Sequence, residues 1–379
     1  MGKRIYIGVD NKARQVKKLY IGIDNVARRI RKAYIGVGGI ARPCFTTKVE
    51  YWGEATPLTT KEMIGRKATT VGNYALFGGG QYGASGMTDV DVYDQSLAKQ
   101  IKSLNIGRYN HSATKVGNYA LFAGGHISGG RSSSVETFNV SLTRGTAPEL
   151  SLAREEMAST TVGNYALFGG GQTGSGMSNN VDVYDSSLTA KSPMSLSKSR
   201  VDGSAESVGD YALFYSGVNA TGGYDNTTID VYNSSLTHSI ITGVTCEVND
   251  GLASTTVGNY ALFGGGNLGK DGSKSSKVLA CNKSLTISYL DLGIKVYEQQ
   301  ATTVNSFAIF AGGSTSKGVV SDVVIFDDSL VKTTGDALKQ ARYRHSAVTV
   351  GYYALFGGGT AGGSNQYSAT TTSVEVYTA

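Results

Sequence analysis

The sequence has few cysteines, prolines and tryptophans, and the cysteine pattern removes two classes of protein. Its 379 residues include 3 Cys, 4 Pro and 1 Trp. Cys44, Cys246 and Cys281 are odd in number, far apart and never in CxxC spacing. The sequence therefore predicts neither a disulfide framework nor a thiolate zinc site, and it indicates a protein made in a reducing compartment.

Long apolar runs are missing as well. No stretch approaches the roughly 18 consecutive apolar residues of a membrane-spanning helix, and the start MGKRIYIGVDNKARQ carries a charge every few positions. We therefore expect no membrane insertion and no secretion signal. Apolar residues make up 40% and charged residues 17% of the chain, a balance too apolar for intrinsic disorder, so most of the chain should fold.

Charge is distributed unevenly along the chain. The formal net charge is +6, yet residues 1–48 hold 12 Lys and Arg against 2 acidic residues, and the remainder holds 23 against 27. A strongly basic N-terminal segment thus precedes a mildly acidic body. This asymmetry indicates two modules with different partners.

A motif of the type VGNYALFGGG recurs seven times and is the strongest signal in the sequence. The copies begin at residues 71, 116, 162, 208, 257, 304 and 350. Each follows an alternating run of small and β-branched residues, with a Gly-Asn pair that suits a tight hairpin. After a variable Gly-rich loop comes a third run such as VDVYD, which in six units enters an Asx-x-Ser-Leu turn. With a less regular fourth strand, each unit is the blade of a β-propeller.

The two ends of the chain predict how the ring of seven blades closes. The seventh unit stops at Ala379 directly after its third strand, whereas residues 48–59 have the pattern of a fourth strand. Closing a ring of this size has an entropic cost that some contact must offset. We therefore expect residues 48–59 to complete blade seven, and the domains to be 1–47 and 48–379.

These units resemble kelch-repeat propellers over about residues 49–379. The shared features are the glycines after the second strand, the Tyr or Phe that ends the third strand, and Arg-x-x-His-Ser-Ala before the first strand. The kelch Trp that follows the third-strand Tyr is missing from every unit, and Trp52 is the only Trp of the chain. The resemblance implies an all-β, divergent kelch-like propeller with seven blades.

The basic segment has a repeat of its own. Three 14-residue copies begin at residues 3, 17 and 31, each with a basic pair, a Tyr-Ile-Gly strand, a turn and an Ala-Arg return. We expect three short β-hairpins, which are marginal alone in water. The copies resemble short repeats at the N-terminus of tail or baseplate structural proteins of phages and prophages of Gram-positive bacteria. This resemblance implies a docking arm, with these contact candidates: Tyr6, Arg14, Tyr20, Arg28, Tyr34 and Arg42.

Two other interpretations of the arm stay open. Its cations would suit nucleic acid, and an unpartnered structural arm would also fit. The strict hairpin period favours strand pairing in an assembly, with the cations facing an acidic partner, over nucleic acid.

A search for catalytic, cofactor or metal residues finds no positive signal. The Gly-rich loops at 78–86 and 169–176 precede strands, whereas phosphate-binding loops precede helices. His111 and His345 occupy one repeat position at which the other units carry no metal ligand. Cys281 stands where other units place Tyr or Phe, so we interpret it as a core residue. An enzyme would need acidic, His or Tyr groups at the mouth of the axial channel. The sequence shows no such cluster, although residues distant in the chain could converge there.

Surface recognition has more support. In a propeller the loops after the second and fourth strands share one face, and here the loops after the second strand vary most. Aromatic and Arg side chains in these loops suit protein or sugar contacts: Tyr82, Arg108, Tyr109, Arg131, Arg154, Arg200, Tyr224, Arg342, Tyr343, Arg344 and Tyr367. The alternative is that the four arginines at equivalent positions brace neighbouring blades.

Taken with the resemblances, these features predict a non-enzymatic structural and adhesion protein of a phage or phage-like particle. It would be assembled in the bacterial cytoplasm and be present in the virion in several copies. The arm would dock to other particle proteins at the tail or baseplate, and the propeller loops would bind a host-surface glycan or protein. The alternative is an intracellular bacterial kelch-like scaffold, and a propeller enzyme is a third class.

Overall fold

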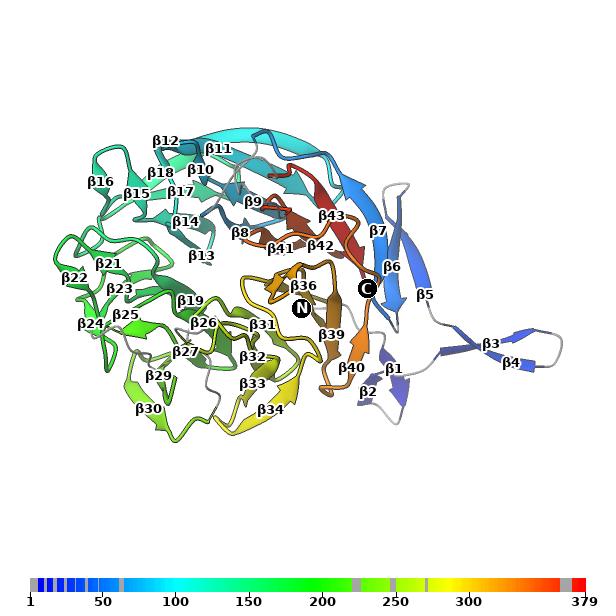
Figure 1. Ribbon diagram of the computed structural model, residues 1–379. Helices are drawn as coiled ribbons and strands as arrows, with labels where there is room; N and C mark the ends of the chain where they lie inside the picture. Colours follow the sequence, from blue (N-terminus) through cyan, green and yellow to red (C-terminus); the bar gives the residue numbers. More distant parts are fainter. Residues whose placement is uncertain are drawn as a thin grey trace.

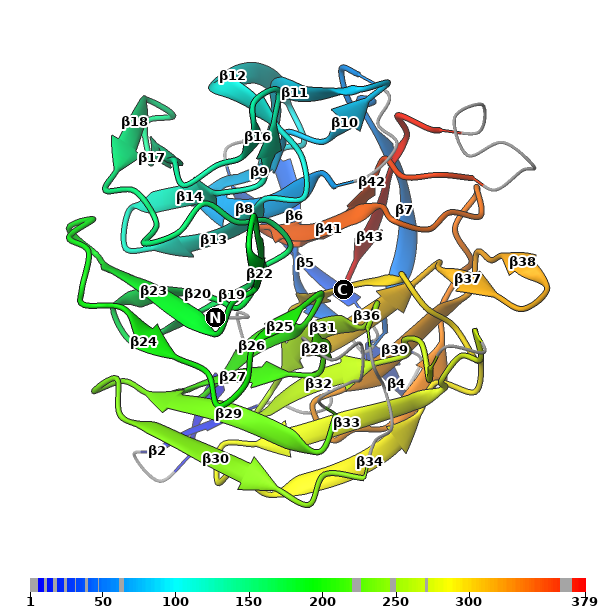
Figure 2. The same cartoon turned by 60° about the vertical axis from the view of Figure 1, so that its left-hand side comes forward.

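The structure is a computed structural model that describes residues 48–60, 65–219, 226–245, 250–269, 272–361 and 370–379. It also gives the backbone of six short strands between residues 6 and 46. The described part is all β and contains no helix, and therefore no helix long and apolar enough to cross a membrane. Seven antiparallel sheets stand around a common axis (Figures 1 and 2). Six have four strands, and the first adds the short strand β10 (Gln81–Tyr82) to its four. This confirms the predicted seven-bladed propeller.

Each blade uses the strands in the order that the repeat predicts, with the first strand innermost. Blade one contains β8 (Lys67–Val71), β9 (Tyr74–Gly78), β11 (Ser85–Asp94) and β12 (Lys99–Arg108). Blade two contains β13 (Ser112–Val116), β14 (Tyr119–Ala123), β17 (Val135–Asn139) and β18 (Arg144–Ala147). Blade three contains β19 (Ala158–Val162), β20 (Tyr165–Gly169), β23 (Asn180–Asp185) and β24 (Met194–Ser195).

The next three blades repeat this order. Blade four contains β26 (Ser204–Val208), β27 (Tyr211–Tyr215), β29 (Thr228–Asn233) and β30 (His238–Thr242). Blade five contains β31 (Ala253–Val257), β32 (Tyr260–Gly264), β33 (Lys277–Asn282) and β34 (Ile287–Asp291). Blade six contains β35 (Gln300–Val304), β36 (Phe307–Ala311), β39 (Val323–Asp327) and β40 (Lys332–Thr334).

Blade seven joins the two ends of the propeller. Three of its strands are β41 (Ser346–Val350), β42 (Tyr353–Gly357) and β43 (Val374–Thr378), and the fourth is β7 (Glu50–Ala55). β7 pairs antiparallel with β43, from Val374 opposite Ala55 to Thr378 opposite Glu50. The prediction that the segment before blade one completes blade seven is confirmed. This shared sheet supplies hydrogen bonds that offset the cost of closure.

The hairpin between the first two strands shows why the Gly-Asn pair recurs. In blade one Val71 pairs with Tyr74, so Gly72 and Asn73 form a two-residue turn, and Gly72 has φ +54. Blade six places Asn305 at this point, with φ +53. Glycine and asparagine are the residues that accept the left-handed region most readily.

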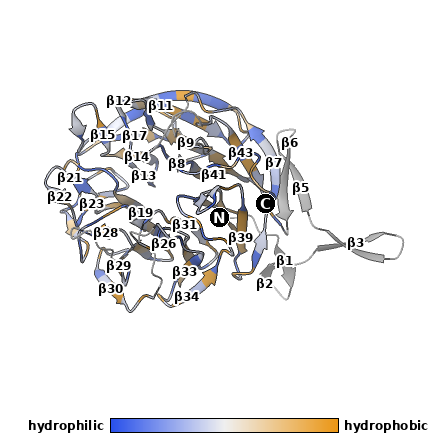
Figure 3. Ribbon diagram, in the orientation of Figure 1, coloured by the Kyte–Doolittle hydropathy of each residue, from blue (hydrophilic) through white to orange (hydrophobic). Residues whose placement is uncertain are grey.

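Apolar residues of the inner three strands pack between neighbouring blades. Hydrophobic residues lie along the strands of the blades around the ring (Figure 3). In blade one the rings of Phe77 and Tyr93 meet edge to face at 5.9 Å, and Phe168 and Tyr184 repeat this in blade three. In blade five Cys281 takes the place of the third-strand aromatic and is fully buried. The interpretation of Cys281 as a core residue is confirmed.

The arm forms three separate two-stranded hairpins, as its 14-residue period predicts. Their strands are β1 (Tyr6–Val9) with β2 (Lys12–Gln15), β3 (Leu19–Ile23) with β4 (Val26–Ile30), and β5 (Lys32–Val37) with β6 (Ile40–Thr46). The predicted docking residues lie one on each strand, and their side chains are outside the described part of the structure. The docking role therefore stays a prediction.

Candidate binding site at the mouth of the propeller axis

One residue from each blade surrounds the propeller axis on the side of the variable loops. These seven residues, here called the axial ring, each lie six positions before the valine that ends the first strand: Gly65, Asn110, Glu156, Asp202, Gly251, Glu298 and Arg344. All have a left-handed φ between +51 and +77. Glycine, asparagine and aspartate accept this conformation readily, whereas it strains glutamate and arginine.

Backbone hydrogen bonds link the axial ring from blade to blade. The N–H of Asn110 donates to the carbonyl of Gly65 at 3.2 Å, and the N–H of Glu156 donates to that of Asn110 at 2.8 Å. The same bond recurs from Asp202 to Glu156, from Glu298 to Gly251 and from Arg344 to Glu298, at 2.9 to 3.3 Å. These bonds require the left-handed turn, which explains why strained residues persist here.

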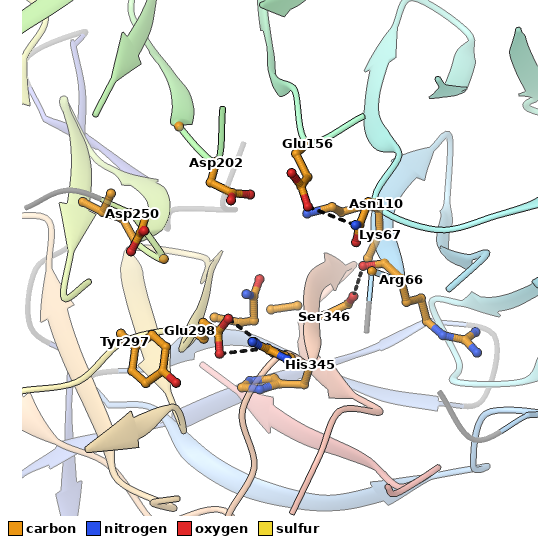
Figure 4. A pocket seen from close by; sticks show the side chains of 18 of the residues that line it. Arg66, Lys67, Asn110, Glu156, Asp202, Asp250, Tyr297, Glu298, His345 and Ser346 are labelled. Carbon is orange, nitrogen blue, oxygen red and sulfur yellow. Dashed lines mark hydrogen bonds and ion pairs between the residues drawn. The ribbon is translucent and has the colours of Figure 1, made fainter. Parts of the chain in front are cut away.

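The axial ring borders a cavity of about 510 Å³, here called the axial cavity. The side chains of Glu156, Asp202, Asp250 and Glu298 gather around it, with Lys67 and Asn110 across from Asp250 (Figure 4). Tyr297, Asn267, Gln300, Ser346 and Leu252 complete much of the wall. The cavity thus combines carboxylates, amides and hydroxyls with a few apolar groups, and its size is that of a small-ligand site.

Only some of the carboxylates have cationic partners. Arg344 Nε donates to both oxygens of Glu298, at 2.8 and 2.9 Å. Asn110 Nδ2 donates to Glu156 at 3.0 Å, and the Asp250 carboxyl has a side-chain hydrogen bond with Asn267. Among the described residues, the Asp202 carboxylate has neither a hydrogen bond nor an ion pair.

Burial and mutual repulsion raise the pKa values of these carboxyls. Burial, followed by the charges of Asp202 and Glu155, raises the pKa of Glu156 to about 7. Burial also raises the pKa of Asp202 to about 6, against the lowering effect of Lys67. Because Asp202 is exposed to solvent, water screens much of this effect. Burial likewise raises the pKa of Asp250 and Glu298. A bound cation would favour the ionised form of all four groups.

A second cavity of about 390 Å³, the inner cavity, lies among the first strands. The two cavities share Ala347 in their walls. Threonines dominate the position two residues before the terminal valine of the first strand: Thr69, Thr114, Thr160, Thr255 and Thr302. Blade four places Glu206 there. Ser207 N–H donates to one of its oxygens at 3.0 Å, and enclosure by the blades raises its pKa to about 7.

The four arginines predicted as surface contacts lie inside the blades instead. Each is at most 2% exposed and pairs with an acidic residue of the third strand: Arg108 with Glu136, Arg154 with Asp182, Arg200 with Asp230 and Arg342 with Glu375. Their guanidinium groups also donate to backbone carbonyls, for example from Arg108 to Gly124 at 2.9 Å. A buried and paired guanidinium has no surface for a ligand, so their assignment to a binding face is wrong. The contacts fit the bracing alternative: Arg108, at the end of β12 in blade one, pairs with Glu136 of blade two, and the other three arginines pair from the connections that lead into blades three, four and seven.

The remaining loop predictions have different outcomes. Arg344 lines the axial cavity. Its guanidinium group lies 5.3 Å from the centre of the Tyr343 ring. Tyr109 packs against His126 at 5.0 Å, and Arg131 pairs with Glu155 at 2.9 Å. Tyr82 is 60% exposed at a loop tip. Tyr224 and Tyr367 lie outside the described residues.

The acidic residues of the axial cavity were missed in the sequence, because residues distant in the chain converge at the channel mouth. Their signal was visible one position before His111 and His345 in the repeat. Aligning the seven units at that position gives Asn110, Glu156, Asp202 and Glu298 in four of them. Asp250 precedes the equivalent Gly251.

The two repeated histidines are buried, although His345 also borders the axial cavity. His111 and His345 are at most 2% exposed, and none of their ring nitrogens has a hydrogen-bond partner. Burial, and then nearby arginines, hold the pKa of both well below the usual value, so the rings are neutral. Within the described ranges, no three His, Cys, Asp or Glu side chains are arranged to hold a metal ion.

The chain matches no protein-family model, and no curated protein is similar to it at a significant level.

Proposed function

We propose that this protein is a non-enzymatic structural and adhesion protein of a phage or phage-like particle. Its arm docks to tail or baseplate proteins. Its kelch-like propeller binds a host-surface glycan or protein on the face that contains the axial cavity. Several copies on one particle compensate for weak binding at each single site.

The axial cavity is the observation that carries this proposal. It lies where the loops after the second and fourth strands meet, and backbone bonds such as Tyr109 N–H to His126 O at 3.1 Å join the two sets of loops. Polar side chains from all seven blades can reach a ligand in it. A preformed polar cavity on a rigid ring suits glycan recognition, because little ordering cost is incurred on binding.

The arm supports the docking half of the proposal. Its three hairpins repeat the same basic and apolar residues at a constant period, which suits a regular, acidic surface of a particle. Two-stranded hairpins of this length gain stability from such a partner.

Incorporation into particles tests the proposal. The full-length chain and a 46–379 truncation, which keeps every blade strand from Glu50 onward, are expressed in the source strain. Particles are then purified and examined by mass spectrometry and imaging. We expect the full-length chain to enter particles and the truncation to fold but stay out. Incorporation of the truncation would contradict docking by the arm, and absence of both would favour the intracellular scaffold.

The carboxyl cluster favours one second candidate, hydrolysis of a bound glycan. A carboxyl with a pKa of about 7, as in Glu156, keeps a proton near neutral pH and can act as a general acid. Chromatography of oligosaccharides after incubation with the protein separates the candidates. New reducing ends that disappear in Glu156→Gln would support an enzyme, and intact oligosaccharides would support adhesion alone.

A further inference from the structure

We propose that the axial cavity recognises a primary ammonium group, and that the glycan it binds contains amino sugars with free amines. This inference rests on the proposed adhesion function and names its ligand class.

The charges that line the axial cavity do not balance. Of its cations, Arg66 pairs with Asp91 in blade one, and Arg344 pairs with Glu298. Lys67 is then left to face Glu156, Asp202 and Asp250. A positively charged ligand group would restore the balance, and a neutral or acidic ligand would not.

The Asp202 carboxylate is the main acceptor in this scheme. It points into the cavity between Glu156 and Asp250 (Figure 4) and has no hydrogen bond to any described residue. An ammonium group has three donors and can bond several carboxylates at once. Such charge-assisted bonds are about twice as strong as neutral ones.

Glu206, in the wall of the inner cavity, adds a carboxylate beyond the axial cavity. It replaces the threonine that five other blades carry, and only one of its oxygens has a partner among the described residues, the N–H of Ser207. It lies four residues after Asp202, which is at most about 13 Å along an extended chain. Two carboxylates, Asp202 and Glu206, that have no cationic partner among the described residues suit a ligand with repeated amines, as in an amino-sugar oligomer.

The rest of the cavity wall favours a sugar over a metal ion. Asn110, Asn267, Gln300 and Ser346 offer amide and hydroxyl groups that can bond sugar hydroxyls. No trio of metal-ligating side chains is placed together in the described ranges. The raised pKa values supply a second readout, because an ammonium favours the ionised carboxyls. Binding should therefore release protons and strengthen as the pH rises from 5 to 7.

The test is calorimetric titration of the full-length protein with two tetrasaccharides, one of glucosamine and one of N-acetylglucosamine, which measures the affinity for each. Asp202→Asn removes the main charge and matches Asn110, while Glu206→Thr matches five other blades, so both should fold. The control is Asp210→Asn, which makes the same change on blade four at the opposite end of β26, where most units already carry Asn.

We expect the glucosamine oligomer to bind at least about tenfold more tightly than the acetylated one at pH 7, the effect of one charged hydrogen bond. Asp202→Asn should abolish most of this preference, Glu206→Thr part of it, and Asp210→Asn none. Titrations in two buffers of different ionisation enthalpy should reveal proton release. Equal binding of both oligomers, no binding of either, or a preference that survives Asp202→Asn would overturn the inference. The adhesion proposal would survive these results if the protein still binds host cells.

Discussion

Arg344 of blade seven donates through Nε to both carboxylate oxygens of Glu298 of blade six, across the boundary between the two blades. The two residues occupy the same position of their repeats, and the Arg344 N–H also donates to the Glu298 carbonyl at 3.1 Å. A backbone hydrogen bond and a side-chain ion pair thus both connect Arg344 to Glu298. The axial ring therefore both links neighbouring blades and presents charge to its cavity.

The left-handed backbone of Glu156 predicts that this cavity residue lowers the stability of the folded protein. Glu156→Asn, which matches Asn110, should raise the free energy of unfolding by about 1 kcal/mol at pH 8, because asparagine accepts this φ and no buried carboxyl remains. Glu156→Val should lower it, since β-branched residues disfavour positive φ. Chemical denaturation measures both, and a loss of stability in the asparagine variant would contradict the strain argument.

The buried ion pairs predict that the effect of removing an arginine on stability depends on whether its acidic partner is present. Arg154→Val should cost about 3 to 5 kcal/mol, because it leaves the Asp182 carboxylate buried without a cation. The double change of Arg154→Val with Asp182→Val should recover most of this loss. Blade six supplies the precedent, with Val296 and Val324 at the two positions.

The control for this pair is Lys191→Ala, which breaks the exposed pair of Lys191 and Asp185 at 2.8 Å. Its melting temperature should equal that of the original protein. If Arg154→Val is equally neutral, the buried pairs do not hold the blades.

The shared sheet of blade seven predicts that closure depends on β7. A chain that begins at residue 60 lacks β7 and should unfold at a lower temperature with a broader transition, because the edge of β43 is exposed and the ring is open. The 46–379 truncation should melt at the temperature of the full-length propeller. Differential scanning calorimetry compares the two, and equal melting would show that β7 adds nothing to closure.

Glu206 predicts a pH effect with a definite sign. Its pKa is about 7 in the folded protein and 4.5 as the ordinary value. Burial therefore makes its ionised form unfavourable in the folded protein: this cost is absent below pH 4.5 and grows as the pH rises through 7. Glu206→Thr should raise the melting temperature at pH 8 and change it little at pH 4.

Buried His111 and His345 act in the opposite direction. Their pKa in the folded protein lies well below 6.5, so their stabilising effect is present above pH 6.5 and is lost as the pH falls. Melting temperatures of Glu206→Thr, measured between pH 4 and pH 8, should therefore still fall at acid pH, because both histidines remain. They should no longer fall at alkaline pH, because the buried carboxyl is gone. An unchanged alkaline limb would contradict the assigned role of Glu206.

The sequence was sufficient to predict the propeller, its seven blades, the closing strand near Glu50 and the burial of Cys281. Each depends on a period or on local turn chemistry, which a single chain displays directly. The arm hairpins follow from the same kind of signal.

The burial of the arginines was harder to predict, because an Arg at a repeated loop position suits both a ligand and an internal brace. The deciding clue lay in the third strands. Glu136, Asp182, Asp230 and Glu375 occur in the blades that have the arginine, and Leu279 and Val324 stand at this position in blades five and six. The axial cavity was missed for another reason, since its carboxyls come from separate units and meet only when the ring closes.

Binding of the labelled full-length protein to intact host cells tests the central claim most directly. The comparison uses the original chain, Asp202→Asn combined with Glu156→Asn, and Asp210→Asn on the opposite face. If the axial cavity is the adhesion site, the double variant should lose most cell binding while Asp210→Asn keeps it, with all three proteins folded. Equal binding by all three would contradict the axial cavity as the adhesion site.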